Sequence, residues 1–155
     1  MNTYNGIWRC IQRLYQIHPF EIETIFKMVG IDKGLLDNQN VSLPVEIILE
    51  FVMDAESVFD DELVSINFGR IAQVRPNYGE AFGLAFVYSK NLEDGLRLLQ
   101  SFIGTELEGM NFLISDEDNL IKIQSVADPS IKHPSIYENL GLSILASFIR
   151  SKRFQ

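Results

Sequence analysis

The stretch that decides the fold runs from Phe68 to Gly104 and reads FGRIAQVRPNYGEAFGLAFVYSKNLEDGLRLLQSFIG. It opens on the end of a helical pattern and continues into a loop marked by proline and glycine. The segment Phe82–Tyr88 (FGLAFVY) is aromatic and β-branched, which predicts a strand. A helix follows it after a short turn. This order of elements predicts a domain that mixes helices and strands.

The helix after Asn91 has the most regular pattern in the chain. Asn91 is a favoured N-cap residue, and Asp94 would stand near the positive end of the helix. Apolar residues then recur at helical spacing, at Leu92, Leu96, Leu99 and Ile103. Gly95 lies inside the pattern at a cost of about 1 kcal/mol relative to alanine. We therefore expect the backbone at Gly95 to lie close to a sheet.

Helical periodicity also dominates the chain before this stretch. It predicts helices over residues 4–17 and 19–29, with Gly30 as the residue that ends the second. A third helix is predicted within residues 42–59, with Ser42 as its N-cap and Pro44 in its first turn. A fourth is predicted over residues 62–72, where acidic residues precede the positive helix end.

Strand patterns return after Gly104. Residues 107–115 and 120–126 flank a polar turn at 116–119, which predicts an antiparallel hairpin with one wet face. Residues 135–150 then predict a final helix. We expect one α+β domain over residues 1–155, in which several N-terminal helices pack on a small, mostly antiparallel sheet, with a C-terminal helix.

Composition limits the functions that the chain can have. Its 155 residues are 46% hydrophobic and 22% charged, as in an ordinary globular domain, and its net charge is −8. This sign argues against direct binding to a nucleic-acid backbone, which needs clustered Lys and Arg. Two acidic runs, at residues 54–62 and 106–118, are interpreted as solvated surface.

The single cysteine and the apolar pattern predict the compartment. Cys10 is the only cysteine, so no intrachain disulfide can form and a reducing environment is expected. No secretory signal is recognisable at the N-terminus, and no apolar run approaches the roughly 20 residues that cross a bilayer. We expect a cytoplasmic protein without a membrane partner, with Cys10 as a core residue.

The residues that usually carry chemistry do not form a catalytic or metal pattern. His18 and His133 both precede prolines and lack His or Cys neighbours at ligand spacing, so they are interpreted as exposed turn residues. The acidic turn at 116–119 lacks the ligand order of a calcium loop. Serine and histidine never meet in a nucleophile motif. We expect no enzyme activity, no metal and no cofactor.

One group of residues is a candidate ligand site. Two cations and three aromatic residues surround the predicted loop and strand: Arg70, Arg75, Tyr78, Phe82 and Tyr88. Small-molecule sites are mostly apolar with a few placed polar groups, and arginine would favour a carboxylate or phosphate. The alternative is that the aromatics are core residues and the arginines are solvated.

The run from Gly30 to Arg150 resembles the N-terminal, arabinose-binding-like effector domain of AraC-type bacterial transcription regulators. The resemblance rests on short matches in a fixed order: Gly30-Ile31, Leu36-Asp37, Val41, Pro44, Ala55, Asp61, Phe68-Gly69, Pro76, Phe82-Gly83-Leu84, Ser89, Leu92, Gly95-Leu96 and the helix around Tyr137 to Ile149. The chain departs from the family at 59–63, which reads FDDEL where Gly-Asp-Pro is frequent, and at Gly95, where alanine is usual.

The resemblance implies a module that senses an unidentified small-molecule effector and dimerises. In the family such a module precedes a pair of helix-turn-helix units, so DNA would be bound only through a C-terminal domain that is absent here. We expect this chain to be the N-terminal part of a longer protein.

A protein–protein interaction module without a small-molecule ligand is the alternative function. The last predicted helix carries small residues among Leu140, Ile144 and Phe148, which are the candidate dimerisation residues. The same helix could equally well pack on the chain's own sheet.

Overall fold

The computed structural model describes residues 1–3, 5–39, 41–72, 83, 86–118 and 120–151. Its helices are α1 (Asn5–Ile17), α2 (Pro19–Val29), α3 (Val45–Val58), α4 (Val64–Ile71), α6 (Leu92–Glu106) and α7 (Pro134–Ser151), with a 3-10 turn η1 (Lys33–Asp37). Its strands are β1 (Asn2–Thr3), β2 (Leu43–Pro44), β3 (Met110–Glu117) and β4 (Leu120–Ala127).

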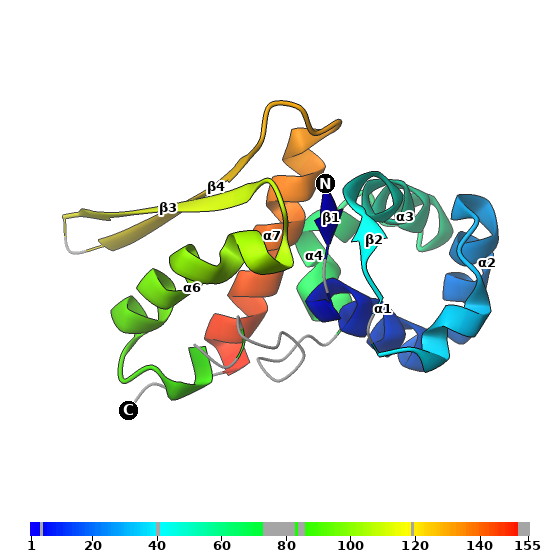
Figure 1. Cartoon of the computed structure of the whole chain (residues 1–155), viewed down its shortest axis with the longest axis horizontal. Helices are drawn as coiled ribbons and strands as arrows, with labels where there is room; N and C mark the ends of the chain where they lie inside the picture. Colours follow the sequence, from blue (N-terminus) through cyan, green and yellow to red (C-terminus); the bar gives the residue numbers. More distant parts are fainter. Residues whose placement is uncertain (4, 40, 73–82, 84–85, 119, 152–155) are drawn as a thin grey trace.

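The predicted α+β class with a C-terminal helix is confirmed. In the described part of the chain the strands form two antiparallel pairs, β1 with β2 and β3 with β4. Helix α7 runs through the middle of the molecule, between α6 with the β3–β4 hairpin on one side and α1 to α3 on the other (Figure 1). The larger strand pair is covered by α6 and α7, while α1 and α3 contact the short β1–β2 pair.

The β3–β4 hairpin forms where the alternating pattern predicts it. Its register pairs Met110 with Ala127 and Glu117 with Leu120. The first strand therefore begins later than predicted and extends further into the polar turn, while the second begins at Leu120 as predicted. Lys122 and Gln124 are exposed on β4 while Ala127 is buried. This alternation confirms the predicted wet face, because successive side chains of a strand point to opposite faces.

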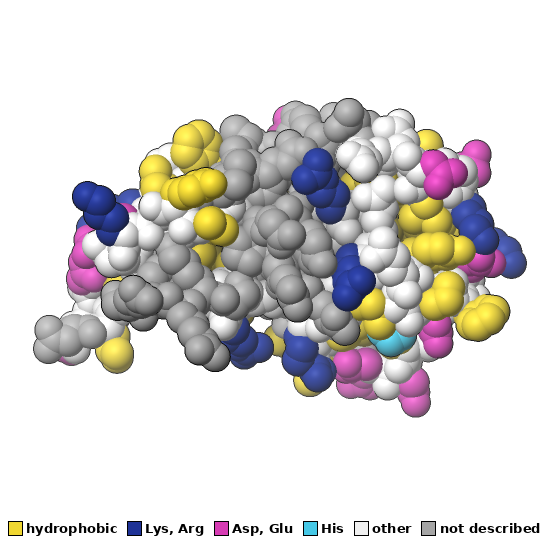
Figure 2. All heavy atoms as spheres, turned by 90° about the horizontal axis from the view of Figure 1, so that it is seen from below, with side chains coloured by type: hydrophobic (Ala, Val, Ile, Leu, Met, Phe, Trp, Pro, Cys, Tyr) yellow, Lys and Arg dark blue, Asp and Glu magenta, His cyan; other side chains and the backbone are white. Residues whose placement is uncertain are grey.

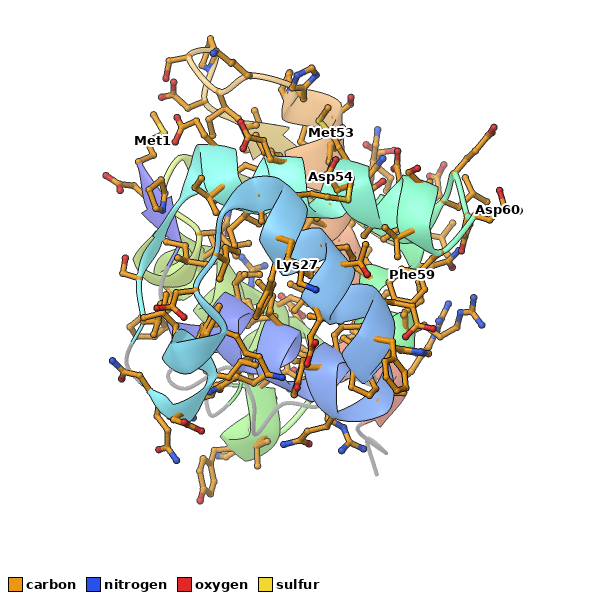
Figure 3. All side chains as sticks on the ribbon, turned by 90° about the vertical axis from the view of Figure 1, so that its right-hand side faces the viewer. Met1, Lys27, Met53, Asp54, Phe59 and Asp60 are labelled. Atoms are coloured by element: carbon orange, nitrogen blue, oxygen red, sulfur yellow. The ribbon has the colours of Figure 1, made fainter. Side chains whose placement is uncertain are left out.

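The N-terminal helices enclose an aromatic core. The rings of Trp8 and Phe26 are stacked with centroids 6.1 Å apart, and Phe51 lies 6.1 Å from Phe26. The indole Nε1 of Trp8 donates to the carbonyl of Asn38 at 2.9 Å, which ties the segment after η1 to α1. Figure 3 looks onto α2 and α3, with Lys27 on α2 and Met53 on α3.

Two of the three predicted helix caps form. Gly30 ends α2 in the left-handed region, with φ of 73°, which favours glycine. The side chain of Asn91 accepts from the Asp94 backbone N–H at 2.8 Å at the start of α6. The Ser42 cap is wrong, because residues 43–44 form β2 and α3 begins at Val45 without a side-chain cap.

The predicted strand Phe82–Tyr88 is also wrong in its described part. Gly83 and residues 86–88 are helical, and Phe86 is buried while Val87 and Tyr88 are exposed. A short apolar run does not by itself distinguish a strand from a buried helical turn. The expected contact of Gly95 with a sheet is therefore wrong as well: a β-carbon there would lie 3.2 Å from the ring of the helical Phe86 and 2.8 Å from Oγ of Ser89, which follows that helical segment.

Helices α4 and α7 cross in unusually close contact at Gly69. A β-carbon at this position would lie 2.3 Å from the carbonyl oxygen of Ser143 and 2.4 Å from Ser147 Oγ. The Gly69 backbone N–H donates to Ser143 Oγ at 2.8 Å. Only glycine fits here without moving the backbone of α7.

We expect Gly69→Ala to destabilise the protein by about 1–3 kcal/mol, because the added methyl group overpacks the crossing against backbone atoms. Urea unfolding followed by circular dichroism measures the free energy of unfolding. Gly104→Ala is the matched control. No atom lies within 4 Å of a β-carbon at exposed Gly104 in α6, so this change should stabilise by about 0.5–1 kcal/mol. Equal effects at the two positions would contradict the close crossing.

Candidate functional site

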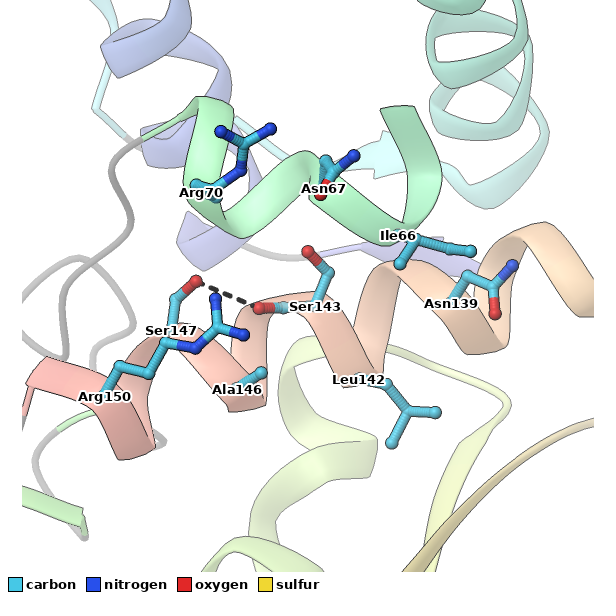
Figure 4. Close-up of a pocket in the computed structure, with 9 residues that line it drawn as sticks. All are labelled: Ile66, Asn67, Arg70, Asn139, Leu142, Ser143, Ala146, Ser147 and Arg150. Carbon is cyan, nitrogen blue, oxygen red and sulfur yellow. Dashed lines mark hydrogen bonds between the residues drawn. The ribbon is translucent and has the colours of Figure 1, made fainter. Parts of the chain in front are cut away.

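The strongest candidate site is a hollow between α4 and α7, about 290 Å³ in volume. Figure 4 shows the side chains that line it. They are Ile66, Asn67 and Arg70 from α4, and Asn139, Leu142, Ser143, Ala146, Ser147 and Arg150 from α7. The positions on each helix recur at three- and four-residue spacing, so each set forms one helix face.

The floor of this α4–α7 hollow is held by the helix crossing. Ser143 is buried and accepts from the Gly69 N–H, and the Ser147 hydroxyl donates to the Ser143 carbonyl at 3.1 Å (Figure 4). These bonds fix both serine side chains against the backbone. The hollow therefore has a rigid, hydrogen-bonded floor.

The charge of the hollow is positive. Arg70 and Arg150 are exposed at its rim, and none of its described lining residues is Asp or Glu. Within the described ranges neither arginine makes an ion pair. Figure 2 shows the face of the molecule seen from below, on which Lys and Arg side chains occur together with Asp and Glu side chains.

The structure separates the residues of the sequence-predicted ligand site. Arg70 lines the α4–α7 hollow, whereas Tyr88 is 81% exposed beside a shallow hollow over the start of α6. Arg75, Tyr78 and Phe82 lie outside the described residues. Among the hollows lined by described residues, Arg70 and Tyr88 therefore do not share one.

Sequence reasoning missed the α7 side of the site. Asn139 and Arg150 lie on the same helix face as the two serines. Their polar, helically spaced pattern was a readable signal, but it looks like the solvated side of an amphipathic helix. The pattern did not predict which helix would pack opposite that face.

The candidate dimerisation residues are not at the surface. Leu140, Ile144 and Phe148 are 0%, 6% and 1% exposed, and the Phe148 ring lies 6.5 Å from that of Phe86. They belong to the chain's own core, so their assignment as partner contacts is corrected. Helix α7 packs on several elements at once, which buries this apolar stripe within one chain.

The other residues with reactive side chains have structural surroundings. Cys10 is buried in α1, as predicted. His133 is exposed, as predicted, but His18 is half-buried and its ring meets Phe59 edge-on at 5.1 Å. In the described part of the chain no group of three or more His, Cys, Asp or Glu side chains is placed to hold a metal ion.

A second polar hollow of about 730 Å³ lies along α1. Its residues include Gln12, whose amide donates to the carbonyl of Leu36 at 2.7 Å, and Arg13, which bonds to Gln16 at 3.0 Å. The Gln12 bond attaches η1 to α1, whereas the Arg13 bond lies within α1. Gln12 thus has a structural role in this hollow.

No protein-family model matches the chain, and no curated protein matches it. Among the described helices, none has both the length and the apolar character needed to span a membrane.

Removing the hydroxyl of Ser143 tests the hydrogen bond under the hollow. We expect Ser143→Ala to cost about 1 kcal/mol or more of unfolding free energy, because the buried Gly69 N–H loses this acceptor. Chemical unfolding measures it. Ser101→Ala, which removes an exposed hydroxyl on α6, should stay within about 0.5 kcal/mol of the parent. A Ser143 variant that is equally neutral would contradict the assigned role.

The acidic run provides a pH-dependent test. Burial, followed by the charges of Glu62 and Asp61, raises the pKa of Glu56 above its ordinary value of 4.5. The folded chain therefore binds more protons than the unfolded chain between 4.5 and the raised pKa, and this contribution to stability is lost as pH rises through that window. Asp60, which belongs to the same run, lies just after the end of α3 (Figure 3).

We expect Glu56→Gln to stabilise the protein at neutral pH, by up to about 0.5 kcal/mol, because it removes a charge that burial and like charges disfavour. The gain should disappear below pH 4.5, where the parent carboxyl is protonated. Unfolding midpoints measured across pH test this, with the exposed Glu50→Gln on the same helix as control. A gain that persists in acid would contradict the electrostatic cause.

Proposed function

We propose that this chain is the ligand-sensing and dimerisation domain of an AraC-type transcription regulator, which controls an attached DNA-binding domain. The observation that carries the proposal is the ordered resemblance from Gly30 to Arg150. The order and spacing of its short matches, rather than any single one, support the assignment.

The places that the matched residues take in the fold add support. Gly30 ends α2 in the left-handed region, and Gly69 makes the α4–α7 crossing. The matched Phe68 is buried beside the crossing. These are positions where a backbone needs a particular residue, so a shared pattern there is what a shared fold would produce.

The acidic character of the chain fits a division of labour. With a net charge of −8, the domain would leave contact with DNA to another segment of the regulator. A ligand would act by binding one of two domain arrangements more tightly, which changes how two DNA-binding halves are presented.

A reporter fusion tests the proposal. The chain is joined to a helix-turn-helix domain that represses a reporter only as a dimer, and the same domain without the chain is the control. We expect the fusion to repress, and a small molecule that raises the thermal midpoint of the purified chain to change the repression. Native mass spectrometry of the purified chain, together with a thermal-shift panel of organic acids, sugars and amino acids, supplies the ligands.

Each other outcome has a clear meaning. Repression that no compound alters, together with no compound that shifts the thermal midpoint, would favour the interaction module without a ligand. A fusion that fails to repress and a chain that binds nothing would overturn both functions.

A further inference from the structure

We infer that the α4–α7 hollow is a binding site for a small organic carboxylate, with Arg70 and Arg150 as the groups that hold the anion. The binding site stands on its own geometry. Its role as the effector site rests on the proposed function.

The charge of the hollow favours an anionic ligand. Arg70 and Arg150 line the same hollow, and none of the described lining residues is a carboxylate that could neutralise their charges. Turning both guanidinium groups into the hollow would bring like charges together, which is unfavourable unless an anion joins them. Arginine offers a planar fork of donors that matches a carboxylate, and such charge-assisted bonds are stronger than neutral ones. A cation is excluded as the ligand, because no described lining residue supplies a carboxylate, imidazole or thiolate.

The hollow is lined by both polar and apolar groups. The amides of Asn67 and Asn139 offer further polar contacts, while Ile66, Leu142 and Ala146 provide apolar surface. This combination suits a ligand with an anionic end and an apolar body. Inorganic phosphate would leave the apolar lining without a partner.

The size of the hollow limits the ligand further. A volume of about 290 Å³ is at the lower end of small-molecule sites, which begin near roughly 300 Å³. It suits a short-chain or single-ring acid better than a nucleotide.

The arginines have room to converge. In Figure 4 the guanidinium of Arg150 extends back along α7, whereas that of Arg70 points away from α7. Arg70 is exposed, so its long side chain can turn over the hollow at the cost of some rotamer freedom. The ligand would thus contact α4 and α7 together and stabilise their crossing.

This coupling explains how such a site would serve a sensor. In the proposed regulator the DNA-binding half lies C-terminal to α7. A ligand that holds α7 against α4 would act on a helix that precedes that half in the chain. Occupancy would then favour the arrangement in which the two helices are in contact.

The test measures binding of acetate, succinate and benzoate to the full 155-residue chain by calorimetry, with benzamide as the neutral counterpart of benzoate. We expect at least one acid to bind and benzamide not to bind. Amide shifts in nuclear magnetic resonance spectra should fall on α4 and α7. Arg70→Gln and Arg150→Gln should each raise the Kd of the bound acid roughly tenfold or more, as expected for loss of a charge-assisted bond.

Arg97→Gln is the matched control, because Arg97 is an exposed arginine on α6 that pairs with Glu93 outside the hollow. All three arginines are exposed, so the variants should fold, which circular dichroism checks. Failure of all three acids to bind would overturn the proposal. The proposal would also be overturned if Arg97→Gln reduced the affinity for the acid as much as the hollow variants do. The same holds if Arg70→Gln and Arg150→Gln both kept the affinity of the parent.

The same data separate the site from the function. If a ligand found by mass spectrometry controls the reporter but ignores Arg70 and Arg150, the regulator proposal stands and this site is wrong. If the acids bind through both arginines but leave the reporter unchanged, the carboxylate site stands and the sensor role is wrong.

Discussion

The structure depends on the contact between Gly69 of α4 and Ser143 of α7. The two backbones approach so closely that a β-carbon at position 69 would lie 2.3 Å from the Ser143 carbonyl oxygen. A hydrogen bond from the Gly69 N–H to Ser143 Oγ joins the helices at the same point. Because protein interiors are tightly packed, a crossing this close fixes the position of everything else that touches α7.

Helix α7 also contacts several other elements, so its position at the crossing determines theirs. Glu138, near its start, accepts from the Ala127 N–H at the end of β4 at 2.9 Å, and Gly141 lies close to Met110 of β3. Phe148, near its end, contacts Phe86. Helix α7 thus contacts α4, the β3–β4 hairpin and the segment that precedes α6. This shared role explains why its apolar stripe is buried within the chain.

The same crossing creates the α4–α7 hollow. Two cylinders that touch at one point diverge on either side of it, and here the side chains that face the resulting gap include polar, basic and apolar groups. The serines that secure the contact also form its floor. A ligand in the hollow would therefore lie directly on the crossing between α4 and α7.

Helix caps, helix ends and the hairpin could be predicted from a few neighbouring residues. Features that depend on which surfaces pack together in the fold could not. The Asn91 cap, the Gly30 helix end and the β3–β4 hairpin follow from backbone preferences and side-chain periodicity over a few residues. The segment at 82–88 was misread because its apolar run fits a strand or a buried helical turn equally well, and contact with α7 and Gly95 favours the helical turn in the described residues.

For the candidate site, sequence by itself identified Arg70 but grouped it with Tyr88, which lies elsewhere. Only the tertiary structure placed Arg70 and Arg150, 80 residues apart, at one hollow. The physical reason is that a helix pattern specifies which face is polar, while the partner of that face is set by packing. Here the packing is set by the crossing of α4 and α7, which approach so closely at Gly69 that only glycine fits.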